Sequence, residues 1–205
     1  YSSPVMRYTS KKLKTDEICD KAVAVNVLNF LYTPQEYRTA ERCLDAVRRD
    51  TDTHMGERAI LSGVPENVLH GPLGNEICKA AVAAKWETLV YVPKEYITAY
   101  MLMRAAEAIP EGDSLYDVSY YFPRAKLTKT LCVAIMKRAG KGFASLPPRF
   151  KKDKDVIDAA ISSYPDAVME LADEQLTEGR LHRALEQDDT LLHRLPDEIL
   201  DRFGI

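Results

Sequence analysis

The hydrophobic and polar positions of this chain recur in a pattern that indicates tandem repeats. A proline is followed five residues later by a threonine, then by a cysteine or aliphatic residue, a small residue, and an apolar segment that leads to the next proline. The period ranges from 24 residues (Ser10 to Pro34) to 31 residues (Pro34 to Pro65). The repeats begin near Ser10, Pro34, Pro65, Pro93, Pro123, Pro147 and Ala172, and Pro196 opens an incomplete further one.

Each repeat predicts two short helices joined by a turn. A threonine stands where the first helix should begin, because its hydroxyl can accept a hydrogen bond from an otherwise unpaired backbone N–H. Apolar residues then follow at three- and four-residue spacing, which places them on one stripe of a helix. The second helix is a short apolar segment, ended by a proline that disfavours helical geometry in the residue before it. The threonine slot holds Thr15, Thr39, Thr98, Thr128 and Thr177, with Gly74 and Lys152 in the two remaining repeats.

Repeats of this size cannot bury their own apolar faces, so they are expected to stack on their neighbours. The predicted fold is therefore all-α, an α-solenoid of about seven short helix-turn-helix repeats with a period of about 24–31 residues. Residues 1–205 are expected to form a single helical-repeat domain. The chain begins with Tyr1 and ends within a repeat, so we expect it to be a fragment of a longer protein. No run of about 18 apolar residues predicts a membrane span.

The four cysteines all occupy one slot of the repeat. In other repeats this slot holds Leu102, Val156 or Leu181, so an aliphatic side chain serves there equally well. We therefore predict buried free thiols rather than disulfides or a metal site, since no Cys-x-x-Cys pair occurs and free cysteine packs as a small hydrophobe. Free thiols favour a reducing, cytoplasmic compartment. The residues concerned are Cys19, Cys43, Cys78 and Cys132.

Three insertions lengthen the middle repeats, at residues 51–63, 67–75 and 109–123. Loops carried on a rigid scaffold often hold binding groups. His54 and His70 lie in the first two insertions, and the third combines acidic residues with tyrosines. A catalytic interpretation would use these histidines and carboxylates as acid and base, but no nucleophile, oxyanion site or metal-ligand spacing accompanies them. We therefore predict neither enzymatic activity nor a cofactor for this chain.

Charge is distributed unevenly along the chain. Residues 124–152, which we call the basic segment, contain nine Lys or Arg residues and no acid, whereas residues 153–205 contain 14 acids and five bases. One interpretation is a basic surface that meets an acidic or phosphorylated partner or a lipid headgroup. The alternative is that the acidic residues after the basic segment neutralise it within the fold. Nucleic-acid binding is not predicted, because no aromatic residues for base stacking are interleaved with the Lys and Arg residues and the net charge of the chain is −3.

The candidate partner-binding residues come from the basic segment and from the insertion before it. Apolar slots such as Cys132, Ile135 and Met136 are expected to face inward, so the bases around them should project outward. Two tyrosines of the third insertion join them as the aromatic part of a binding surface. The candidates are Lys126, Lys129, Lys137, Arg138, Lys141, Arg149, Tyr116 and Tyr120.

Several runs of the chain resemble a known repeat family. TDEICDKAV, TAERCLDAV and NEICKAAV, with LVYVPKEY and SLPPRF between them, resemble the tandem repeats of the bacterial family called domain of unknown function 4116. The resemblance implies a protein–protein interaction module of a bacterial protein, including effectors directed at a host cell and secreted into it. It transfers no catalytic residue, because the shared pattern consists of core and cap positions. Two alternatives stay open: a recruiting or regulatory arm of an enzyme whose active site lies outside this chain, and anionic-lipid binding through residues 124–152.

Overall fold

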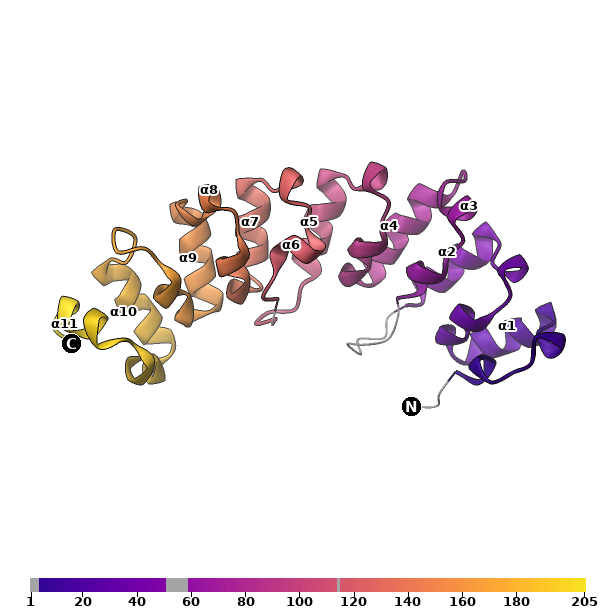
Figure 1. Ribbon diagram of the computed structural model, residues 1–205, viewed down its shortest axis with the longest axis horizontal. Coiled ribbons are helices and arrows are strands. Elements are labelled where there is room, and N and C mark those ends of the chain that lie inside the picture. Colours follow the sequence, from indigo (N-terminus) through magenta and orange to yellow (C-terminus); the bar gives the residue numbers. More distant parts are fainter. Residues whose placement is uncertain (1–3, 51–58, 114) are drawn as a thin grey trace. The chain divides into compact units, whose positions relative to one another are not determined.

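The computed structural model describes residues 4–50, 59–113 and 115–205, and it is built of helices (Figure 1). Every regular element in these three ranges is an α-helix or a 3-10 helix, and none of them is a strand. The prediction of an all-α fold is therefore confirmed. The chain divides into two compact bodies, Tyr1–Ala108 and Ile109–Ile205, where the sequence predicts one repeat domain. We call them the N-terminal body and the C-terminal body; the single domain stays a prediction.

The N-terminal body combines α-helices with 3-10 helices, for which we use the symbol η. In chain order the elements are η1 (Val5–Arg7), η2 (Lys11–Leu13), α1 (Asp16–Val25), η3 (Val27–Tyr32), η4 (Gln35–Tyr37), α2 (Ala40–Arg48), η5 (Ile60–Gly63), α3 (Glu66–Leu69), α4 (Gly74–Ala84), η6 (Trp86–Tyr91), η7 (Lys94–Tyr96) and α5 (Ala99–Ala108).

The C-terminal body contains the same two kinds of helix. Its elements are α6 (Val118–Tyr121), η8 (Arg124–Lys126), α7 (Lys129–Met136), η9 (Gly140–Ser145), α8 (Pro148–Lys151), α9 (Lys154–Ser163), η10 (Pro165–Glu170), α10 (Glu178–Gln187), η11 (Asp189–Arg194) and α11 (Asp197–Phe203).

In most repeats the longer α-helix is followed by a 3-10 helix, so the two helices of a repeat are not equivalent; in the fourth repeat the short α-helix α6 takes that place. The apolar segments expected as second helices form η3, η6 and η9, each six residues long. Helices of this length are not stable alone, so packing on a neighbouring helix must stabilise them. Each of these segments packs on the α-helix before it, as η3 does on α1 and η6 on α4. Within each body, neighbouring α-helices also pack together, α2 on α4 and α7 on α9.

Threonines cap α1, α2, α5, α7 and α10, as the sequence predicts. Thr15 Oγ1, for example, accepts a hydrogen bond from the Ile18 amide at 3.4 Å, and Thr128 Oγ1 accepts one from the Leu131 amide at 3.2 Å. Thr39, Thr98 and Thr177 act in the same way.

In the two repeats without threonine, the residue predicted to cap the helix does not do so. Lys152 is not a cap; the next residue, Asp153, accepts hydrogen bonds from the Asp155 and Val156 amides at 3.0 and 3.4 Å. Gly74 is the first residue of α4 rather than its cap, and the preceding Leu73 supplies no side-chain hydrogen bond. The first turn of α4 thus lacks the side-chain acceptor that the threonine-capped helices have.

The repeat slots form the core of each body. All four cysteines are buried and free, and the residues that replace them in other repeats are buried too. The small slot is equally enclosed at Ala46, Ala105 and Ala184, whereas Ala22 is half-buried. Alanine there lets neighbouring helices approach closely, so the pattern seen in the sequence is chiefly a packing pattern.

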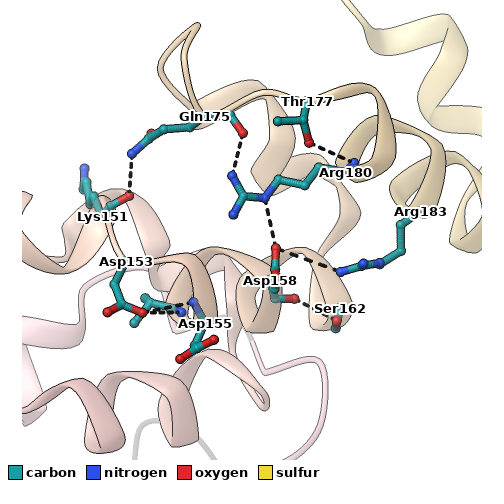
Figure 2. Close-up of polar contacts among 10 residues, drawn as sticks. Lys151, Asp153, Asp155, Asp158, Ser162, Gln175, Thr177, Arg180 and Arg183 are labelled. Carbon is teal, nitrogen blue, oxygen red and sulfur yellow. Dashed lines mark hydrogen bonds and ion pairs between the residues drawn. The ribbon is translucent and has the colours of Figure 1, made fainter.

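A contact between arginine and aspartate recurs in the two bodies. Arg180, the third residue after its cap, donates from Nε to Asp158 Oδ1 on α9 at 2.9 Å and from Nη1 to the Gln175 carbonyl at 2.6 Å (Figure 2). Arg42 stands at the same position after Thr39 and contacts Asp20 Oδ2 at 3.4 Å. Both aspartates are the fifth residue after their own cap. The two arginines therefore join consecutive helices by equivalent contacts.

We expect Arg180→Met to lower the free energy of unfolding by about 1–2 kcal/mol, because it leaves Asp158 and a carbonyl without their main donor. The Arg180 and Asp158 side chains are only 14% and 26% exposed. Arg183 lies 3.9 Å from the same carboxylate but is 49% exposed, so Arg183→Met is the matched control and should cost less than about 0.5 kcal/mol. Urea denaturation of both variants, each with and without Asp158→Asn, measures the coupling. Equal costs for the two arginines would contradict this assignment.

Candidate functional site

The basic segment separates into two groups at opposite ends of α7. Lys129 is the first residue of this helix and Lys137 follows its last, so the rise of about 1.5 Å per residue puts their backbones about 12 Å apart. Lys126 precedes the helix, and Arg149 joins the same end because its guanidinium donates to the Leu127 carbonyl at 3.5 Å. Arg138 and Lys141 follow the other end. The candidate bases thus do not make one continuous row.

At the N-terminal end of α7, the acidic residues after the basic segment neutralise Lys129. Its Nζ lies 3.0 Å from Asp153 Oδ2 and 2.6 Å from Asp155 Oδ2, both at the start of α9. These hydrogen bonds raise the pKa of Lys129, and the bond from Lys129 lowers the pKa of Asp153. Of the two interpretations of the basic segment, the structure supports charge neutralisation by neighbouring aspartates, rather than an acidic partner, for Lys129.

At the other end of α7, Lys137, Arg138 and Lys141 form a group that we call the basic cluster. The Lys141 ammonium lies 5.7 Å from the centre of the Tyr116 ring and 5.6 Å from that of Tyr164. Arg138 Nη1 contacts Glu111 Oε1 at 3.1 Å. Lys137 is exposed and forms no ion pair within the described part of the chain. The cluster therefore has one exposed cation, Lys137, and two half-buried ones, of which Lys141 lies near two aromatic rings.

Close packing between the ends of α7 and α9 fixes this region. The Ser163 hydroxyl of α9 donates to the Met136 carbonyl at the end of α7. Gly140 lies directly against the last turn of α9, where there is no room for a side chain. These contacts hold the backbone between Lys137 and Lys141 in place.

Part of the third insertion folds as a tight turn over the basic cluster. The Asp113 amide donates to the Pro110 carbonyl at 3.2 Å, and Gly112 has a φ of 74°, which only glycine adopts readily. The Gly112 amide donates to the Arg138 carbonyl at 2.8 Å. Burial raises the pKa of Asp113, an effect that the Leu115 amide and the nearby Lys141 charge oppose. We call residues 110–113 the inserted turn; it attaches the insertion to the end of α7.

The two candidate tyrosines are exposed and differ in what they contact. Tyr116 is 66% exposed and contributes a ring to Lys141, so the structure brings this candidate to the basic cluster. Tyr120 is 67% exposed and packs edge-on against Tyr121 at 4.8 Å between ring centres. Sequence reasoning missed Tyr164 and Glu111, which complete the cluster. Neither belongs to a repeat slot that would have singled it out.

A groove of about 520 Å³ runs between α7 and α9. Lys129 and Lys137 line it from one helix and Asp155 and Asp158 from the other, with Val133 among the apolar residues. The Lys129–Asp155 ion pair connects its two walls. Charges of both signs therefore meet in the groove, and this does not favour one class of charged ligand.

The histidines have separate surroundings. His70 Nδ1 lies 3.3 Å from Glu95 Oε1, and His182 Nε2 lies 3.2 Å from Glu186 Oε1 one turn along α10. His54 lies outside the described residues. Among those that the structure describes, no three His, Cys, Asp or Glu residues gather in a way that could hold a metal ion. In the same ranges, no helix combines the length and apolar character needed to span a membrane.

Comparison of the chain with protein-family models, with curated proteins and with solved structures finds no match. The resemblance to the tandem repeats of domain of unknown function 4116 therefore stays a prediction.

Proposed function

We propose that the chain is a protein–protein interaction module, and that its C-terminal body contacts an acidic partner through the basic cluster and Tyr116. The observation that supports this most is the exposed Tyr116 ring beside the Lys141 ammonium. Tyrosine and arginine are enriched in protein interfaces, which favours Tyr116 and Arg138 as contact residues. Lys137 and Arg138 add positive charge at the same end of α7, which favours carboxylates on the partner.

The wider setting of the function rests on the repeat resemblance and on the thiols. A module of a bacterial protein directed at a host cell is the setting that the resemblance implies. Four free and buried cysteines suit a reducing compartment, such as the cytoplasm of either cell. An enzyme outside this chain would use the same surface to recruit its substrate, so that alternative shares the test below.

Reversing two charges of the basic cluster should weaken partner binding. We expect Lys137→Glu with Arg138→Glu to reduce capture of the partner from a host-cell lysate by about tenfold, because like charges then face the partner's carboxylates. Added salt should also reduce capture by the unmodified chain, since exposed charges are screened over about 8 Å at physiological ionic strength. The amount of each captured protein is measured by quantitative mass spectrometry.

The matched control is Lys11→Glu with Lys12→Glu, which changes the charge equally on exposed residues of the N-terminal body. It should leave capture unchanged. Both variants are checked by thermal melting, because bases at the end of α7 also complement the partial negative charge of a helix C-terminus. A lower melting temperature with full capture would mean that the basic cluster only stabilises the fold. Equal loss of capture in both variants would mean that net charge, and not this surface, drives association.

A further inference from the structure

The inserted turn places an acidic side chain on the basic cluster of the same chain. Glu111 Oε1 lies 3.1 Å from Arg138 Nη1, and the neighbouring Gly112 amide donates to the Arg138 carbonyl at 2.8 Å. Tyr116, a few residues further on, covers one side of Lys141. The insertion thus contacts the cluster by a carboxylate, a backbone amide and an aromatic ring.

The ion pair between Glu111 and Arg138 is a weak one. The Glu111 side chain is 82% exposed and that of Arg138 is 37% exposed. Exposed pairs of this kind contribute little, because water and salt screen them and two flexible side chains must be ordered. By contrast, the backbone hydrogen bonds of the inserted turn do not depend on this carboxylate. Glu111 can therefore leave Arg138 while the turn stays folded.

We infer that Glu111 is an internal competitor for the basic cluster, and that an acidic peptide segment of a partner protein binds there by displacing it from Arg138. This inference rests on the proposed function and names the chemistry of the partner. The carboxylate that Arg138 already contacts is the side chain of a glutamate, so a glutamate of another protein segment can take its place. The cluster also has two further cations, which can contact additional carboxylates. Lys137 has no ion pair within the described residues, and Lys141 lies near two aromatic rings and near the Asp113 carboxyl.

An acidic peptide fits these groups better than a membrane surface or a single phosphate. Lys137, Arg138 and Lys141 are spread over a five-residue stretch, so several carboxylates along a peptide can each find a cation. The exposed face of Tyr116 suits an apolar side chain between them. A membrane would need the other bases of the segment on the same side, yet Lys129 and Arg149 lie at the opposite end of α7, and Lys129 is neutralised there.

The test measures binding of a fluorescein-labelled peptide of alternating Glu and Gly residues to the whole chain by fluorescence anisotropy. We expect Glu111→Gln to tighten binding by about two- to fivefold, because the competitor loses its charge. Arg138→Gln should weaken binding by a similar factor. In the Arg138→Gln background, Glu111→Gln should have no further effect, since the two residues act on the same contact.

The control is Glu107→Gln, which removes the carboxylate of another exposed ion pair, with Arg104 in the N-terminal body. If Glu107→Gln tightens binding as much as Glu111→Gln, general charge repulsion explains the effect and the inference is wrong. The inference is also wrong if the peptide binds through Arg138 but Glu111→Gln changes nothing; the proposed function would then stand without it. If the chain binds phosphatidylserine vesicles, or if inorganic phosphate displaces the peptide while a Gln-Gly peptide binds equally well, the assignment of an acidic peptide fails.

Discussion

Replacing Gly140 by alanine is expected to lower the free energy of unfolding by about 3 kcal/mol, a change of more than about 100-fold in the unfolding equilibrium. An added Cβ would lie 2.4 Å from the Ala160 carbonyl oxygen, 2.5 Å from Ser163 Oγ and 2.8 Å from Tyr164 Cβ. The first of these is backbone of α9, and the other two are held close to it, so the end of α7 must move away. Close-packed interiors cannot absorb such a shift locally.

A second glycine provides the matched control for this experiment. Gly179 lies in α10, and a Cβ there would meet nothing within 4 Å. Gly179→Ala should raise the free energy of unfolding by about 0.5 kcal/mol, because alanine loses less conformational freedom in a helix. Urea denaturation followed by circular dichroism measures both variants. If Gly140→Ala unfolds at the urea concentration of the unmodified protein, the ends of α7 and α9 are not packed as described.

The thiols of Cys43, Cys78 and Cys132 are expected to react about 100-fold more slowly in the folded protein than in the unfolded one, and that of Cys19 is expected to react more slowly as well. Burial raises the pKa of Cys43, Cys78 and Cys132 to about 11, from an ordinary value of 9.0. Burial also raises the pKa of Cys19. Only the thiolate is a strong nucleophile, so a pKa two units higher leaves about 100-fold less reactive species at neutral pH. Lack of access for the reagent adds to this factor.

Labelling with iodoacetamide, followed by mass spectrometry of each cysteine with and without urea, measures the difference. The raised pKa values also set a direction for stability. The contribution of these thiols to the free energy of unfolding is fully present below about pH 9. It is lost between about pH 9 and 11, because in that range the thiols of the unfolded protein ionise while those of the folded protein stay protonated. Rapid labelling of the folded protein at about pH 8, or a mass that indicates disulfides, would contradict the assignment of these residues to the core.

The sequence predicts the helix starts and the core slots well because both depend on local chemistry. A threonine hydroxyl needs only an amide three residues away, and this contact forms at Thr15 and Thr128 as expected. The shift from Lys152 to Asp153 has the same origin. The Lys152 side chain has no acceptor, whereas the Asp153 carboxylate next to it accepts two amide hydrogen bonds, and alignment of the repeats alone ignores this difference.

The candidate site was harder to predict, because its residues meet only in three dimensions. A run of bases in the sequence gives no sign that α7 separates them, or that Asp153 and Asp155 reach back to Lys129. Tyr164 comes to Lys141 through the packing of α9 on η9. Such contacts join residues more than 20 positions apart, where periodicity carries no information.

The alternation of α-helix and 3-10 helix accounts for the short period of the repeat. Ten residues of α1 advance the chain by about 15 Å at 1.5 Å per residue. Six residues of η3 extend about 12 Å at 2.0 Å per residue, so they cover most of the same length with fewer residues. Repeats made of two α-helices have periods of about 33–47 residues. Because η3 is more extended per residue than an α-helix, the chain completes the repeat from Ser10 to Pro34 in 24 residues. Each further repeat then adds another helix end to the surface.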